Sequence, residues 1–312
     1  MGGLLKKYFK MNRNQIGKEK SPRFILQTKQ IISRIGFACG IILVGLLICV
    51  PVTAYDQQAI DYANQGVDYY NLGQYNSAIA SFDKALQIEP KIVEAWVSKG
   101  SALISLGRYT EALDASDEAL KINPNLLEAL NNKGNALVSL GRYTEALEAV
   151  DKALQINPNY SMAWYNRGNA LYRLSKYDEA IASFDKALKF NSQYTEAWQF
   201  RGIALEKLGR YDDAISSYDK AIQINPNYSD AWYNRGNTLA RLNQYDNAVA
   251  SYDKALQINP DKLEARQNRE AMLEKKKVVK TSQQQTQKAP LIYAPLGAIA
   301  LMIALFMWQK RR

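Results

Sequence analysis

The sequence predicts an all-α protein built from repeated pairs of helices, with one apolar segment on each side of the array. Two observations carry this prediction. Aligned with itself, the chain repeats every 34 residues from Ala59 to Lys262, six times and without a gap. The apolar segments 35–54 and 291–308 contain no charged residue. A period of this length is typical of stacked helical units, each of which buries its apolar face only against its neighbours.

Composition excludes several classes of protein. The 312 residues contain no His, and the two Cys, Cys39 and Cys49, both lie in the first apolar segment. The commonest general base is therefore missing, and there is no Cys/His cluster for a metal or a redox site. We expect no enzyme activity, no cofactor and no metal.

The distribution of charge argues against a nucleic-acid partner, although the formal net charge is +10. Residues 1–34 carry nine Lys or Arg and one Glu, whereas residues 55–274 carry 23 basic and 29 acidic residues. The excess positive charge therefore lies beside the apolar segments, which is typical of membrane topology signals and not of a DNA-binding face.

Residues 35–54 are predicted to be an N-terminal transmembrane helix or a signal sequence. Twenty helical residues at 1.5 Å each span a bilayer core of ~30 Å. The basic segment 1–34 precedes them and, by the positive-inside rule, stays in the cytoplasm. Cleavage after Ala54 is the alternative to an uncleaved anchor, and the anchor is favoured because the basic segment is long for a signal peptide.

Residues 291–308 are predicted to be a C-terminal transmembrane helix, preceded by a polar linker over 277–290. Lys310, Arg311 and Arg312 follow the span, so this terminus is also expected in the cytoplasm. An integral membrane protein with its repeats on the extracytoplasmic side follows from the two spans. The tail also resembles the C-terminal sorting signals of some prokaryotic surface proteins, but a plain anchor is preferred.

Each 34-residue unit is predicted to form two helices. The units are 59–92, 93–126, 127–160, 161–194, 195–228 and 229–262. With Ala59 as position 1, Gly recurs at position 8 and Ala at positions 20 and 27 in all six units. These small residues allow neighbouring helices to approach closely, and the large residues at positions 4, 11, 17 and 24 fill the space between them.

The turn between the two helices is marked by residue type. Position 15 is Gly in four units, with Ser175 and Asn243 in the other two, and Gly takes φ > 0 at low cost. The column three residues later is predicted to cap the second helix. It comprises Asn76, Thr110, Thr144, Asp178, Asp212 and Asp246. A proline follows the second helix in five units and is replaced by Ser192 in one.

These columns resemble the tetratricopeptide repeat (TPR): 34 residues, Trp and Gly early, Ala-x₃-Phe late and Pro at the end. The resemblance implies a right-handed superhelical solenoid of six helix-turn-helix units, and residues 263–276 are interpreted as its polar capping helix. Leu130 replaces the early aromatic residue, and Ser116 and Val150 replace the late one. We therefore expect looser packing around the second and third repeats.

The resemblance also implies that the first helix of each unit lines a concave groove that binds an extended peptide or a partner helix. An Asn amide offers both a donor and an acceptor to a peptide backbone, and Tyr adds flat aromatic surface. The predicted contact residues are Asn132, Asn135, Tyr165, Asn166, Asn169, Tyr172, Tyr233, Asn234 and Asn237. The alternative is that the asparagines hold neighbouring helices together. Phe200 and Ile203 interrupt the asparagine columns in the fifth repeat.

Position 7 forms a basic column, for which pairing with acidic residues of adjacent helices is favoured over binding of an acidic partner. The Lys/Asn/Arg set with which chaperone-binding members of the family hold a terminal carboxylate is not matched. The predicted function is a membrane-tethered scaffold that binds protein or peptide partners. A cytoplasm-facing assembly or co-chaperone platform, or a sorted surface protein that binds other ligands, is the alternative.

Overall fold

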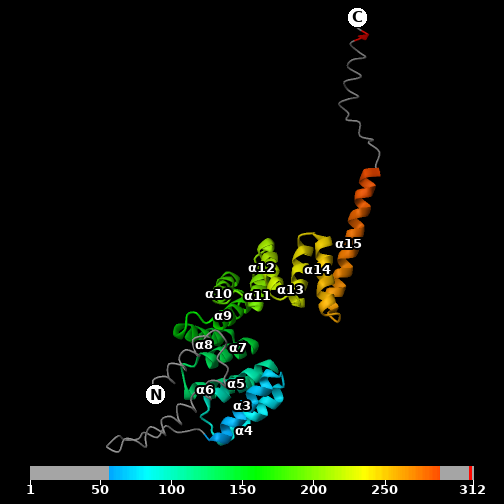
Figure 1. Cartoon of the computed structure of the whole chain (residues 1–312). Helices are drawn as coiled ribbons and strands as arrows, with labels where there is room; N and C mark the ends of the chain where they lie inside the picture. Colours follow the sequence, from blue (N-terminus) through cyan, green and yellow to red (C-terminus); the bar gives the residue numbers. More distant parts are fainter. Residues whose placement is uncertain (1–55, 289–308, 311–312) are drawn as a thin grey trace, which may run out of the picture. The chain divides into compact units, whose positions relative to one another are not determined.

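The computed structural model describes residues 56–288 and 309–310, and within these ranges it contains thirteen helices and no strand (Figure 1). The described chain forms two units, one ending at Ser192 and the other beginning at Gln193. No helix in 56–288 is long and apolar enough to cross a bilayer. The predicted spans 35–54 and 291–308 lie outside the described residues.

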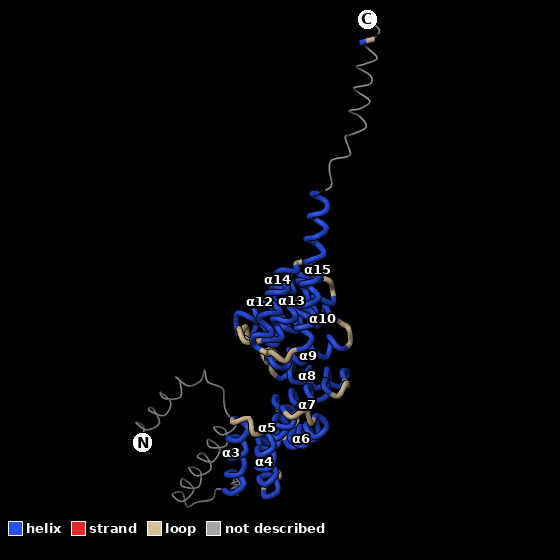
Figure 2. Tube along the Cα trace, turned by 90° about the vertical axis from the view of Figure 1, so that its right-hand side faces the viewer, coloured by secondary structure: helices blue, strands red, loops and turns tan. Residues whose placement is uncertain are grey.

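The helices follow the predicted pairs, and short loops connect them (Figure 2). The first unit contains α3 (Gln57–Asn71), α4 (Tyr75–Ile88), α5 (Val93–Ser105), α6 (Tyr109–Ile122), α7 (Leu127–Ser139), α8 (Tyr143–Ile156), α9 (Ser161–Arg173) and α10 (Tyr177–Phe190). The second unit contains α11 (Thr195–Lys207), α12 (Tyr211–Ile224), α13 (Ser229–Arg241), α14 (Tyr245–Ile258) and α15 (Leu263–Lys288).

Within the first unit the helices form an inner and an outer row. The first helices of successive repeats touch each other, α3 with α5, α5 with α7 and α7 with α9. The second helices α4, α6, α8 and α10 contact the first helices but not one another in this part of the chain. Because the inner row is the more closely spaced, the first helices face the concave side of this unit.

The small residue at position 8 exists because a large side chain from position 24 packs against it. Phe82 and Phe184 are completely buried and lie against Gly66 and Gly168 in the first unit, as Tyr218 does against Gly202 in the second. In the second repeat, position 24 is the small residue Ser116, so no large side chain from that position packs against Gly100. Ser116 Oγ donates to the carbonyl oxygen of Ala112 at 2.7 Å.

The turn between paired helices closes as predicted, with φ between 72° and 78° at the four glycines and φ of 60° and 59° at Ser175 and Asn243. The predicted N-caps of the second helices are wrong. These helices begin two residues earlier than that column requires, at Tyr75, Tyr109 and their equivalents, and no side chain caps them. The reason is that the helix-ending turn is followed directly by the next helix: Arg108 both donates to the carbonyl of Leu103 and accepts from Ala112.

The last helix, α15, runs from Leu263 to Lys288 and thus continues through most of the segment interpreted as a linker. No Gly or Pro interrupts this stretch before Pro290. Ala265 and Met272 are buried against the sixth repeat, whereas Val278 is 62% exposed. α15 therefore packs against the sixth repeat within 263–276 and continues as a helix beyond this range.

Candidate binding groove

A hollow of about 250 Å³ opens on the inner face of the first unit. It is formed mainly by positions 2, 5, 6, 9 and 12 of the first helices of the first four repeats. Its lining residues are Val67, Tyr70, Asn71, Phe82, Val97, Ser98, Ser101, Glu128, Asn132, Tyr160 and Met162. Three helices, α3, α5 and α7, contribute most of this surface, so the groove depends on the stacking of repeats and not on any single one.

The lining is largely apolar with a few polar groups. Val67, Val97 and Met162 supply aliphatic surface, Ser98 and Ser101 supply hydroxyl groups, and no Lys or Arg belongs to the lining. A site of this composition, concave and mostly apolar with a small number of polar groups, suits a peptide side chain.

Glu128 is the acid of the lining, and Tyr160 supplies a half-buried phenol. Burial raises the pKa of Tyr160 above its ordinary value, and the charge of Glu128 adds to this effect. Tyr160 is therefore a neutral hydroxyl at physiological pH, able to donate one hydrogen bond and to accept others.

Of the predicted contact residues, Asn132 lines this hollow, but its amide is already used between repeats. It is 8% exposed, and Nδ2 donates to the carbonyl oxygen of Val97 at 3.1 Å and to Ser101 Oγ at 2.9 Å. Asn166, 4% exposed, makes the equivalent contact one repeat later, where its Nδ2 donates to Asn131 Oδ1 at 2.8 Å. These two side chains join neighbouring first helices.

The other predicted residues of the first unit are half-buried on the inner row. The ring of Tyr165 packs at 6.0 Å from that of Phe184, and Tyr172 packs at 5.6 Å from Tyr177. Asn135 lies one turn after Asn132 on α7. Asn169 differs from all of these, because its Oδ1 is buried without a hydrogen-bond partner among the described residues.

Tyr233, Asn234 and Asn237 lie on α13 in the second unit and are not among the residues that line the hollow. Asn237 Oδ1 accepts from Tyr252 at 2.8 Å and from Asn268 Nδ2 at 2.9 Å. Lys262 Nζ lies 4.8 Å from the centre of the Tyr233 ring. Asn268, on the capping helix, occupies the position that Asn132 has in the third repeat, so the inter-repeat hydrogen bond recurs at the end of the array.

Glu206 on α11 is a partly buried carboxyl group on the inner row of the second unit. Burial raises its pKa, while hydrogen bonds from Thr238 and Tyr218 and the charges of Arg241 and Lys207 act in the opposite direction. The carboxylate therefore has polar partners but lies in a poorly solvated position, which disfavours its charged form.

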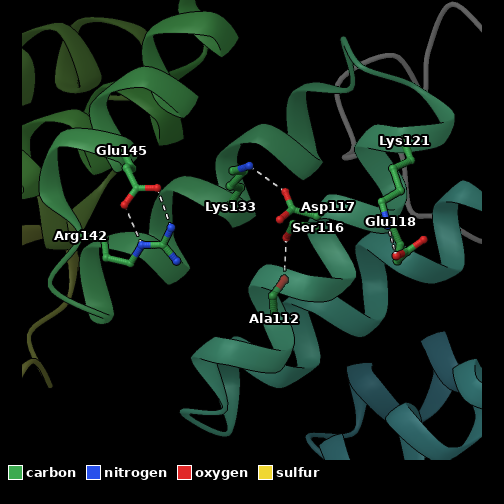
Figure 3. A network of polar contacts seen from close by, with 8 residues as sticks. All are labelled: Ala112, Ser116, Asp117, Glu118, Lys121, Lys133, Arg142 and Glu145. Atoms are coloured by element: carbon green, nitrogen blue, oxygen red, sulfur yellow. Dashed lines mark hydrogen bonds and ion pairs between the residues drawn. The ribbon is translucent and has the colours of Figure 1, made fainter.

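The basic column pairs with aspartates of the preceding second helices, as predicted. Lys99 contacts Asp83 at 2.6 Å and Lys133 contacts Asp117 at 2.7 Å, and the pairs Arg167–Asp151 and Arg235–Asp219 repeat the contact. Figure 3 shows the Lys133–Asp117 pair between neighbouring helices. These four cations therefore form ion pairs between neighbouring helices and are not a free positively charged surface for acidic partners.

Sequence reasoning missed most of the groove lining, including Val67, Val97, Glu128 and Met162. It selected the amides at positions 6 and 9 and the tyrosines at positions 5 and 12 because their chemistry stands out. The hollow also uses aliphatic and acidic residues at positions 2, 5 and 9, where the residue type varies from repeat to repeat. The repeat register was the available signal, since every first-helix position is known once the period of 34 is aligned.

The fold defines a helical-repeat protein with a groove on the inner face of its first unit. The chain belongs to the tetratricopeptide repeat family. Models described as tetratricopeptide repeat match residues 64–126 and 131–195 and residues 229–262, and a model described as TPR repeat matches residues 204–243. As such it is consistent with a protein-interaction scaffold, since TPR proteins bind protein or peptide partners.

Solved structures show the same fold. A thermophilic TPR protein of Thermus thermophilus is 25% identical with a TM-score of 0.53, over 58% of this chain and 99% of that one. The APC/C hetero-tetramer Cut9-Hcn1 is 17% identical with a TM-score of 0.67, over 84% of this chain and 50% of that one. Pseudomonas aeruginosa PilF is 22% identical with a TM-score of 0.57, over 68% and 97%. No curated protein matches the sequence.

Proposed function

We propose that this TPR protein is a membrane-tethered scaffold that holds an extended segment of a partner protein in the groove of its first unit. The observation that carries the proposal is the hollow lined by α3, α5 and α7, which combines aliphatic and hydroxyl groups on the inner row. Peptide recognition by an apolar groove requires side-chain pockets together with polar groups that orient the main chain.

The lining favours a particular kind of segment. Val67, Val97 and Met162 offer apolar contact, and Glu128 places one negative charge at the groove, whose lining among the described residues contains no Lys or Arg. An apolar side chain followed by Lys or Arg, or by an uncharged residue, matches this surface. An acidic segment would place its carboxylate near Glu128 and is therefore disfavoured.

The groove is tested by site-specific photocrosslinking in cells. A photoreactive amino acid replaces Val97 in the groove or, as the matched control, Ala80, which is exposed on the outer helix α4. We expect a discrete crosslinked partner from position 97 only, and its loss when Met162→Arg is added. Identical crosslinks from both positions, or none from position 97, would contradict the groove as the binding surface.

The membrane tether and the extracytoplasmic location of the repeats rest on the sequence of 35–54 and 291–308, with basic residues at both termini. Protease treatment of intact cells tests the location independently of the groove. The repeats are expected to be digested in intact cells. If they survive there and are cut only after lysis, the repeats face the cytoplasm and the protein is an internal assembly platform.

A further inference from the structure

The third repeat lacks a tryptophan that three other repeats use in a fixed way. In those repeats the indole Nε1 at position 4 donates to the carbonyl oxygen of the proline that follows the preceding second helix. The pairs are Trp96 with Pro90 at 2.9 Å, Trp164 with Pro158 at 2.8 Å, and Trp232 with Pro226 at 3.0 Å. Leu130 stands at position 4 of the third repeat and has no donor to offer Pro124.

The cation that covers the tryptophan ring is nevertheless present in the third repeat. Lys99 Nζ lies 5.2 Å from the centre of the Trp96 ring, and the guanidinium groups of Arg167 and Arg235 lie 5.7 and 6.0 Å from their rings. These three side chains are 20%, 27% and 25% exposed. Lys133, with no ring beside it, is 32% exposed and still pairs with Asp117.

A hollow of about 540 Å³ lies at this place. Its lining includes the half-buried Leu120, the almost fully buried Leu130 and Ala149 (3% and 6% exposed), Pro124, and the acidic residues Asp117, Glu145 and Glu148. Lys133 and Lys152 belong to its charged rim. Its volume is within the range of ligand pockets, about 300–1,000 Å³. We call this hollow the Leu130 pocket; it shares no residue with the groove.

We propose that the Leu130 pocket binds a tryptophan side chain of a partner protein, in the arrangement that this chain uses for its own tryptophans. The incoming indole lies over Leu130 and Ala149, its N–H donates to the Pro124 carbonyl oxygen, and the Lys133 ammonium faces the ring. The three internal tryptophans identify the occupant, because each uses the same two elements that the pocket retains. Tryptophan is also enriched among the residues that dominate interface energies.

Binding of 5-fluoroindole to the full-length chain, followed by ¹⁹F NMR, tests the pocket without knowledge of the partner. Saturable broadening is expected with the natural sequence. Leu130→Trp places an indole in the pocket from within and should weaken probe binding at least tenfold. Equal binding by the natural sequence and by Leu130→Trp, or no saturable binding at all, would overturn the proposal.

A second pair of variants keeps the test decisive if Leu130→Trp does not fold. Lys133→Met and Lys99→Met each break an ion pair with the preceding helix, but only Lys133 faces the pocket. Loss of a cation–π contact should weaken probe binding about two- to fivefold in Lys133→Met, with no change in Lys99→Met. Equal effects of the two variants would overturn the proposal.

The probe itself supplies the last control. 1-Methyl-5-fluoroindole has nearly the same ring but cannot donate to Pro124, and one hydrogen bond is worth about threefold or more in affinity. We expect it to bind correspondingly more weakly than 5-fluoroindole. Equal affinity of the two compounds would show that the ring is held without the Pro124 carbonyl and would overturn the proposed arrangement.

Discussion

The ring of Phe184 lies against Gly168 so closely that a Cβ atom at Gly168 would be 2.5 Å from its Cε1. The same relationship joins Gly66 to Phe82. Gly100 is the exception, because the nearest atoms to its added Cβ are 3.5 Å away, on Asn132 and Ser116. One repeat position therefore has two different steric environments.

Gly168→Ala should lower the free energy of unfolding by about 1–3 kcal/mol, because the buried ring has to move. Gly100→Ala should leave it unchanged or raise it by up to about 1 kcal/mol, since Ala is the better helix former and meets no clash. Urea denaturation followed by circular dichroism measures both. Equal destabilisation by the two substitutions would contradict the steric explanation.

Ser175→Gly should raise stability by about 1 kcal/mol, because Ser175 has φ of 60° in a region that costs a residue with Cβ about 1–2 kcal/mol. Asn243→Gly should give a smaller gain, since Asn tolerates this region better and Asn243 Oδ1 also accepts from Tyr245 at 2.7 Å. Thermal unfolding of both variants tests the order, and a larger gain from Asn243→Gly would contradict it.

Glu206→Gln should alter the pH dependence of stability. Burial raises the pKa of Glu206 from 4.5, so the folded state holds its proton to higher pH than the unfolded state. The carboxyl group therefore lowers stability progressively as pH rises from about the unfolded value through the folded one. The advantage of Glu206→Gln over the natural chain should grow across this window in urea titrations. An advantage that is constant with pH would exclude this effect.

Asn132→Ala should loosen the contact between the second and third repeats. Its amide donates twice across the interface between α5 and α7, so the loss is about 1–2 kcal/mol. Amide hydrogen exchange should accelerate in α5 and α7. The matched control is Asn135→Ala, one turn further along the same helix. If exchange accelerates only in this control, the contact between the repeats depends on Asn135 and not on Asn132.

The fold could be predicted because each helix pair repeats the same local signals. Period, small-residue columns and the helix-ending Gly all describe backbone geometry, which is determined within one unit and its neighbour. The N-cap prediction at Thr110 and its equivalents failed for a local reason: residue type favoured capping, but the turn occupies only Leu106, Gly107 and Arg108, so Thr110 is already the second residue of α6.

The groove could be predicted only in outline. The register identifies inner positions. Whether the Asn132 amide is free for a ligand depends on the preceding repeat, where the Val97 carbonyl oxygen and Ser101 Oγ both accept hydrogen bonds from it. The Leu130 pocket is the reverse case. The missing tryptophan is visible in the sequence, whereas the retained lysine contact and the hollow require the positions of three helices.

The helix α15 continues well beyond the part that packs against the sixth repeat. About twelve helical residues follow Lys276, and at 1.5 Å per residue they extend about 18 Å. A flexible chain of that length has a similar mean reach but samples all directions. A continuous helix instead fixes the distance and direction from the sixth repeat to Lys288, so the orientational entropy of this segment is lost once, at folding.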